Sequence, residues 1–194
     1  NRIFGRRLAE VTIGIIGVGR IGSRVIRRSK PFGTPKILVN DIDTSYRLNL
    51  DYKMEWVSKE KMYKVADIIS LHLPLTRFTK NMIRKEQLLS MKKDALIINT
   101  SRGGIINEQD LYEVMKAGHL GGAAIDVFEN EPYLGRLVEI ERCILTAHMG
   151  SMSKDCRSKM EIESTEEIIR FYKGETLQNE VPQSEYDTQI SEMK

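Results

Sequence analysis

The sequence of 194 residues is 41% hydrophobic and 29% charged, which is typical of one soluble globular domain with a substantial core. The formal net charge of +3 and the sequence pI near 8.8 are mildly basic, but Lys and Arg are interspersed with Asp and Glu, so the charge pattern does not favour a nucleic-acid partner. No apolar run approaches the roughly 18 to 20 residues that a membrane span needs, so we expect no membrane partner.

Short runs rich in Ile, Val and Leu recur along the chain, and segments with a helical pattern lie between them. The runs are nearly continuous in apolar residues, which is typical of parallel strands that are buried on both faces. In chain order we predict strand 12–16, helix 21–29, strands 36–40 and 54–57, helix 58–65, strand 68–71, helix 85–91, strand 96–99, helix 108–116, and strands 122–127 and 144–146. Asn107 is the expected N-cap of the helix at 108–116, and Gly118 is its expected stop.

This alternation of strands and helices predicts an α/β fold, a doubly wound parallel sheet of the Rossmann type with about six to seven strands and flanking helices. We expect right-handed crossovers between the strands. The ligand site of such a sheet lies at the carboxyl ends of its strands. We assign residues 11–150 to this domain, residues 151–174 to a C-terminal helix, and residues 175–194 to a polar tail with little to bury.

The two cysteines, Cys143 and Cys156, have neither the spacing of metal ligands nor the density of a disulfide framework. We therefore expect free thiols in a reducing compartment, which favours the cytoplasm, and we expect no metal site. The charged residues 1–10 do not resemble a signal peptide. Because the first residue is Asn1 rather than Met, we expect the chain to be an excised or processed part of a longer protein.

The first predicted strand runs directly into a GxGxxG pattern that is followed by a helix. In this context the first glycine permits a tight turn, the second lets the backbone approach a pyrophosphate, and the third allows close helix packing. Asp41 ends the second strand roughly 20 residues later, where a carboxylate accepts hydrogen bonds from ribose hydroxyls and repels a 2′-phosphate. The pattern therefore predicts NAD rather than NADP. The predicted cofactor-binding residues of this part are Gly17, Gly19, Arg20, Ile21, Gly22 and Asp41.

Three further segments carry a more specific pattern: residues 66–76 read ADIISLHLPLT, residues 96–132 read LIINTSRGGIINEQDLYEVMKAGHLGGAAIDVFENEP, and residues 146–150 read TAHMG. In this order they resemble the signatures of the D-isomer-specific 2-hydroxyacid dehydrogenase family. The resemblance implies an NAD-binding domain from which the N-terminal part of the substrate domain is absent. By the same resemblance, residues 1–10 would be the end of an interdomain helix, and residues 175–194 a remnant of the substrate domain.

The resemblance also implies roles for three catalytic residues. Arg102 would hold the substrate carboxylate and carbonyl, because a planar guanidinium matches a carboxylate bidentately and stays charged. His148 would give and take the proton of the reaction, since imidazole can do both near neutral pH. Glu131 would accept a hydrogen bond from the far nitrogen of that ring and keep it oriented. The implied lining of the cofactor groove is Asp126, at the nicotinamide carboxamide, with Leu73, Pro74 and Thr100.

Taken together, the resemblance implies an oxidoreductase that transfers a hydride between NAD(H) and a small D-2-hydroxy acid or its 2-keto acid. We expect the isolated chain to turn over poorly, because a second domain must close over the cofactor. A homodimer through the cofactor domain is also implied. Two alternatives stay open: an NAD(H)-sensing, corepressor-like interaction protein, and a formate- or phosphite-type dehydrogenase on the same scaffold.

Overall fold

The computed structural model describes residues 5–33, 35–43 and 54–180. The chain forms two compact units, Asn1–Ala147 and His148–Lys194. The first unit contains β1 (Thr12–Ile16), α1 (Gly22–Ser29), β2 (Lys36–Asn40), β3 (Met54–Trp56), α2 (Lys59–Val65), β4 (Ile68–Leu71), α3 (Lys85–Ser90), β5 (Leu96–Asn99), α4 (Glu108–Lys116), β6 (Gly122–Ile125) and β7 (Cys143–Leu145), with 3-10 helices at Leu8–Glu10, Lys30–Phe32 and Arg136–Glu139.

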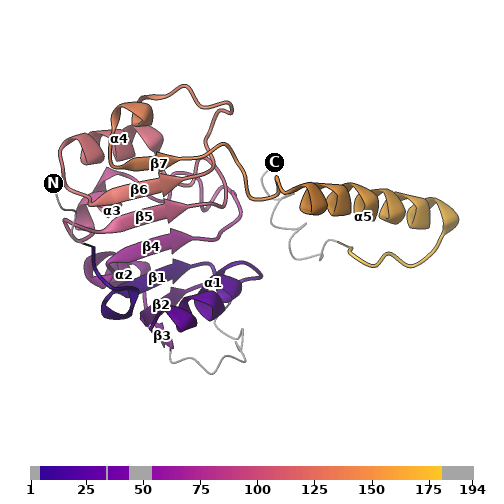
Figure 1. Cartoon of the computed structure of the whole chain (residues 1–194), viewed down its shortest axis with the longest axis horizontal. Helices are drawn as coiled ribbons and strands as arrows, with labels where there is room; N and C mark the ends of the chain where they lie inside the picture. Colours follow the sequence, from indigo (N-terminus) through magenta and orange to yellow (C-terminus); the bar gives the residue numbers. More distant parts are fainter. Residues whose placement is uncertain (1–4, 34, 44–53, 181–194) are drawn as a thin grey trace. The chain divides into compact units, whose positions relative to one another are not determined.

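The seven strands form one parallel sheet in the order β3-β2-β1-β4-β5-β6-β7 (Figure 1). β1 pairs with β2 on one side and with β4 on the other, so the chain reverses its direction of travel across the sheet at β1. In an open α/β sheet, the crevice for a ligand lies outside the carboxyl ends of the strands at this reversal. The predicted doubly wound parallel sheet of six to seven strands is therefore confirmed.

The helices begin and end close to where the sequence predicts them. The Ser58 side chain accepts a hydrogen bond from the Lys61 amide and caps α2, and the Asn107 side chain caps α4 in the same way. Gly118, with φ +77°, stands just after α4 as the predicted stop. The differences are small: α1 begins at Gly22, α3 ends at Ser90, β3 ends at Trp56, β6 ends at Ile125, and β7 spans Cys143–Leu145.

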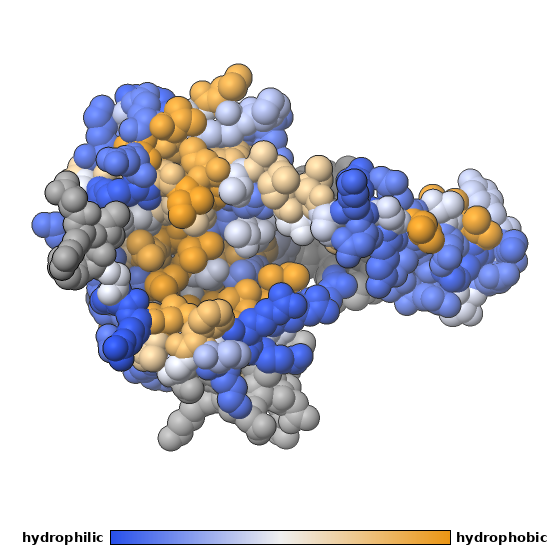
Figure 2. Space-filling view, viewed as in Figure 1, coloured by the Kyte–Doolittle hydropathy of each residue, from blue (hydrophilic) through white to orange (hydrophobic). Residues whose placement is uncertain are grey.

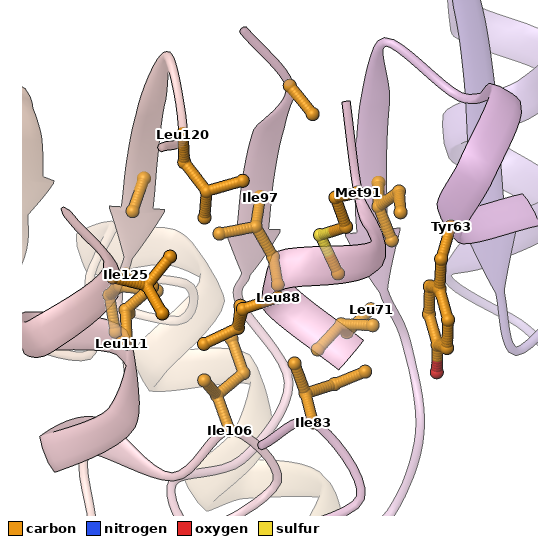
Figure 3. Close-up of a cluster of buried hydrophobic side chains, with 14 of the residues drawn as sticks. Tyr63, Leu71, Ile83, Leu88, Met91, Ile97, Ile106, Leu111, Leu120 and Ile125 are labelled. Atoms are coloured by element: carbon orange, nitrogen blue, oxygen red, sulfur yellow. The ribbon is translucent and has the colours of Figure 1, made fainter. Parts of the chain in front are cut away.

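Two apolar clusters lie on opposite faces of the sheet, because successive side chains of a strand point to opposite faces. The larger cluster joins the strands to α2, α3 and α4, with Leu71, Leu88 and Ile97 completely buried (Figure 3). The smaller one joins β1 and β2 to Ile26 of α1. Figure 1 accordingly has α1 on one face and the other three helices of this unit on the opposite face.

The face of the sheet that carries α1 is incompletely covered at β5, β6 and β7. Ile98, Ala124 and Ile144 are neighbours in register on this face, and Ile144 remains 69% exposed. Leu96, two residues before Ile98, is 39% exposed. Figure 2 shows apolar residues gathered over the strands here. The opposite face of the same strands is buried under helices, so the two faces differ sharply in solvent contact.

Two adjacent leucines of α3 give a matched test of the larger cluster. Leu88 is completely buried and Leu89 is 48% exposed. We expect Leu88→Ala to lower the free energy of unfolding by about 2–5 kcal/mol, because it leaves a cavity. Leu89→Ala should change it by about 0.5 kcal/mol or less. Urea unfolding of both variants measures the difference, and equal losses would contradict the assigned orientation of α3.

Within its described residues, 148–180, the second unit contains one helix, α5 (Lys154–Lys173), and Gly174, with φ +69°, follows as its C-cap. Glu167 accepts hydrogen bonds from the amides of Gln178 and Asn179, at 2.9 and 3.3 Å, so the segment after the helix folds back along it. This helix lies within residues 151–174, where the sequence predicts one, and starts at Lys154. Residues 181–194 of the predicted tail lie outside the described residues.

At the other end, residues 5–7 have no regular secondary structure and Leu8–Glu10 form one turn of 3-10 helix, so the interdomain helix assigned to residues 1–10 stays a prediction. Residues 1–4 lie outside the described part of the chain. Within the described ranges, none of the helices has both the length and the apolar composition needed to cross a membrane.

Candidate functional site

The glycine turn (residues 17–22) follows β1 at the reversal point of the sheet. Gly17 has φ +91°, and a Cβ there would lie 2.3 Å from the carbonyl oxygen of His72. A Cβ on Gly22 would lie 2.0 Å from the carbonyl oxygen of Gly17. Both positions therefore accept only glycine. Gly19 differs, because nothing lies within 4 Å of the place where its Cβ would stand. The middle of the turn is open where the sequence predicts a pyrophosphate.

Asp41 directly follows β2 and braces this turn. Its carboxylate accepts a hydrogen bond from the Val18 amide at 2.6 Å and one from the Asp43 amide at 3.2 Å. The structure thus brings the predicted ribose-binding acid to the glycine turn across 23 residues of sequence. Arg20 and Ile21, the other predicted cofactor residues here, are both exposed at the start of α1.

The segment after β4 borders the same turn. Leu73 is half-buried, and its Cδ2 lies 3.0 Å from where a Gly17 Cβ would be. Pro74 is exposed, and its carbonyl oxygen accepts a hydrogen bond from the Thr79 hydroxyl at 2.7 Å. The His72 ring nitrogen Nε2 lies 2.9 Å from the Ser70 hydroxyl. Leu73, predicted to line the cofactor groove, therefore lies next to the glycine turn.

Burial lowers the pKa of His72 below its ordinary value of 6.5. Because the unfolded chain then binds more protons than the folded chain, the stabilising effect of the neutral ring is complete above about pH 6.5 and is lost as the pH falls through the folded pKa. We expect His72→Gln to remove the part of the pH dependence of stability that comes from this ring. Urea unfolding of wild type and variant at about pH 8 and about pH 5 measures it. An identical pH dependence in both proteins would contradict the prediction.

The arginine turn (residues 99–104) follows β5. Asn99 is 2% exposed, and its side chain makes three hydrogen bonds within the turn, to the Arg102 carbonyl, the Ser101 amide and the Ser101 hydroxyl. Arg102 is exposed, and its Nη1 donates to the Ser101 carbonyl at 2.7 Å. Thr100 is exposed beside it. The turn therefore has a fixed backbone and presents the guanidinium to solvent at the carboxyl end of β5.

The acid turn (residues 126–131) follows β6 and packs directly on the arginine turn. A Cβ on Gly103 would lie 2.0 Å from both the carbonyl carbon and the oxygen of Phe128, so only glycine permits this approach. The Asp126 amide donates to the Asn99 carbonyl at 3.0 Å. The Glu131 carboxylate accepts from the Phe128 amide at 3.0 Å. The structure thus brings the predicted residues Arg102, Asp126 and Glu131 onto two turns in contact.

Two further side chains hold the acid turn. The Thr146 hydroxyl donates to the Asp126 carboxylate at 2.5 Å. The Glu108 carboxylate accepts from the Glu129 amide at 2.7 Å. Burial raises the pKa of Glu108, and the negative charge of Glu129 raises it further against that hydrogen bond. Asp126 itself is 9% exposed. Its position is therefore set by both the β5 end and the β7 end of the sheet.

His148 is the first residue of the second unit, and its side chain is exposed. Its backbone φ is +54°, an uncommon value for a residue other than glycine, although histidine is among the residues enriched there. The predicted hydrogen bond between Glu131 and this imidazole joins residues of the two units and stays a prediction.

Sequence reasoning did not identify two residues that organise the site. Asn99 and Thr146 appear in the quoted motifs only as the ends of strands, yet their side chains hold Arg102 and Asp126. The available signal was their residue type: Asn and Thr side chains commonly bond to nearby groups at strand ends and turns. Among the described residues, no group of three His, Cys, Asp or Glu side chains is arranged to hold a metal ion.

Known proteins resemble this chain in sequence and in fold. The profile "D-isomer specific 2-hydroxyacid dehydrogenase, NAD binding domain" matches residues 1–150. The glyoxylate reductase of Korarchaeum cryptofilum (strain OPF8) is 40% identical over 183 residues, which are 93% of this chain and 53% of that protein. The chain thus spans about half the length of this relative.

Solved structures agree. The crystal structure of a glyoxylate reductase from Paecilomyes thermophila has a TM-score of 0.85 and 30% identity, covering 94% of this chain and 55% of that one. The D-lactate dehydrogenase from Aquifex aeolicus, complexed with NAD and lactic acid, has a TM-score of 0.81 and 30% identity, covering 89% and 56%. Since the profile spans more than half of the chain, the chain belongs to the D-isomer specific 2-hydroxyacid dehydrogenase family and carries its NAD-binding domain.

Proposed function

We propose that this chain is the cofactor-binding half of an NAD-dependent dehydrogenase that interconverts a small D-2-hydroxy acid and its 2-keto acid. The observation that supports this most directly is the packing of the arginine turn on the acid turn. This packing holds Arg102 and Glu131 at the carboxyl ends of the strands, where the glycine turn also lies. Because the chain spans about half of its relatives, substrate binding would need a part outside these 194 residues, and the isolated chain would turn over poorly.

The glycine turn and its surroundings fit a dinucleotide. The open space at Gly19 would admit a pyrophosphate against the backbone, and the N-terminus of α1 favours negative charge there. Arg20 and Ile21 are accessible at the same turn. The Asp41 carboxylate lies just after β2, where it would accept hydrogen bonds from the ribose hydroxyls and repel a 2′-phosphate. Asp126, Thr100, Leu73 and Pro74 would line the remaining groove.

Bound NAD(H) supplies the hydride chemistry. In the direction of reduction, Arg102 would bind the carboxylate of the 2-keto acid through two parallel hydrogen bonds and so fix the orientation of its carbonyl. His148 would donate a proton to the carbonyl oxygen, and it would take that proton back in oxidation. Glu131 would keep the imidazole oriented. Its own carboxylate is already held by the Phe128 amide, so its position is partly preset.

We further propose that the protein works in the cytoplasm as a homodimer that pairs through the cofactor domain. The free thiols of Cys143 and Cys156 support a reducing compartment. Light scattering of the chain at high concentration tests the dimer, and a purely monomeric mass would count against it.

The decisive experiment is an assay of the full-length protein with NADH and a panel of 2-keto acids, including glyoxylate, hydroxypyruvate and pyruvate, repeated with His148→Ala. We expect turnover of at least one acid, and a fall in kcat of about 10²- to 10⁴-fold in the variant. Unchanged turnover by the variant would remove the proposed proton donor. Tight NADH binding without turnover of any acid would instead favour the first alternative, a sensor of NAD(H), and oxidation of formate or phosphite would favour the second, a formate- or phosphite-type dehydrogenase.

A further inference from the structure

We infer that Asn99 is a positioning residue for substrate binding: its side chain holds the backbone at Arg102 and thereby sets the affinity for the 2-keto acid. This inference rests on the proposed function, because it assigns Arg102 to the substrate carboxylate. Asn99 is the last residue of β5 and is 2% exposed, so its side chain does not itself face solvent.

Both polar atoms of the Asn99 side chain, Nδ2 and Oδ1, make hydrogen bonds within the arginine turn. Nδ2 donates to the Arg102 carbonyl at 2.9 Å. Oδ1 accepts from the Ser101 amide at 3.1 Å and from the Ser101 hydroxyl at 2.8 Å. Only a side chain with a donor and an acceptor on one planar group can make both sets of bonds. Asp offers acceptors alone, and Ser is too short to span the turn.

The main chain of Asn99 has a separate task. Its carbonyl accepts the Asp126 amide at 3.0 Å, which joins the arginine turn to the acid turn. The packing of Gly103 on Phe128 joins the same two turns a second time. These contacts do not depend on the Asn99 side chain. A substitution at this position can therefore loosen Arg102 while the two turns stay together.

Two parallel hydrogen bonds between the Arg102 guanidinium and the substrate carboxylate require the guanidinium to point in one direction. Arg102 is exposed, and its only described side-chain bond runs to the neighbouring Ser101 carbonyl, so the direction of its guanidinium depends on the backbone that carries it. A displacement of about 1 Å in a substrate-positioning group can reduce catalysis about 10²-fold. The loss should fall mainly on the keto acid, because the glycine turn that would bind the pyrophosphate of NADH follows β1 and makes no described hydrogen bond with the Asn99 side chain.

The experiment compares Asn99→Asp with Ser101→Ala in the full-length protein. Asn99→Asp keeps the acceptors for Ser101 and replaces the donor to the Arg102 carbonyl by a second oxygen. Ser101→Ala removes only the hydroxyl bond and leaves the bond to Arg102. We expect Asn99→Asp to raise the KM for the best 2-keto acid by about 10- to 100-fold with the Kd for NADH changed less than about threefold. Ser101→Ala should keep both constants near wild type.

A double-mutant cycle with Arg102→Gln separates positioning from a general structural effect. If Asn99 acts through Arg102, adding Asn99→Asp to Arg102→Gln causes no further loss in kcat/KM. Independent, multiplying losses, or a parallel rise in the Kd for NADH, would overturn the inference. Should Asn99→Asp fail to fold, Asn99→Ser carries the same measurements. An inactive wild type overturns the proposed function and this inference together, whereas an active wild type with an unchanged KM in both Asn99 variants overturns the inference alone.

Discussion

Gly19→Ala should abolish most of the NADH affinity of this chain and leave its fold intact. The added methyl group meets no atom within 4 Å in the protein, so the melting temperature should stay at the wild-type value. The same methyl group would occupy the space where the backbone must approach a pyrophosphate. Overpacking of a close contact typically costs about 1–3 kcal/mol, which corresponds to a Kd for NADH raised by roughly 5- to 150-fold.

Two glycines serve as controls for this substitution. Gly5 also has nothing within 4 Å of its Cβ position but lies before β1, so Gly5→Ala should change neither stability nor affinity. Gly22→Ala would place a methyl group 2.0 Å from the Gly17 carbonyl oxygen and should reduce both together. Fluorescence titration with NADH and thermal unfolding by circular dichroism measure the two effects. Wild-type affinity in Gly19→Ala would mean that the dinucleotide does not lie over this turn.

The sheet could be predicted almost completely because its signal is local. Buried parallel strands are continuous apolar runs, and most of the strands here are followed by a glycine turn or a polar residue. The end of β6 was harder. The predicted strand 122–127 continues through Asp126 and Val127, which are buried, but β6 stops at Ile125. The end of a strand depends on how far the neighbouring strand pairs with it, and β7 pairs with β6 only at residues 123–125. No local pattern records that limit.

The candidate site divides in the same way. Gly17, Gly22 and Asp41 follow from spacing and backbone geometry, and the structure brings them together at the reversal point of the sheet. The bonds that position Arg102 and Asp126 could not be predicted, because they form between turns whose contact depends on the pairing of β5, β6 and β7. In the sequence Asn99 is marked only as the end of a strand, and its side-chain bond to the Arg102 carbonyl is visible only in the folded chain.

Arg102→Gln should reduce kcat/KM of the full-length protein for 2-keto acids by roughly 10²- to 10⁴-fold, since each hydrogen bond between charged groups is worth about 1.5–3 kcal/mol and a bidentate pair has two. The Kd for NADH and the melting temperature should stay near wild type, because the guanidinium is exposed and bonds within its own turn only to the Ser101 carbonyl. The charge and the geometry of the guanidinium can then be separated by a second variant.

Arg102→Lys keeps the positive charge but presents a flexible ammonium instead of a planar fork. We expect it to recover about tenfold of the lost kcat/KM, with the remainder still missing because the keto acid is no longer held in one orientation. Inhibition by oxamate, an unreactive analogue of a 2-keto acid, gives the same ranking without turnover: wild type binds it most tightly, then Arg102→Lys, then Arg102→Gln. Equal inhibition of all three proteins by oxamate would show that the substrate carboxylate is held elsewhere, and the arginine turn would then have only a structural role.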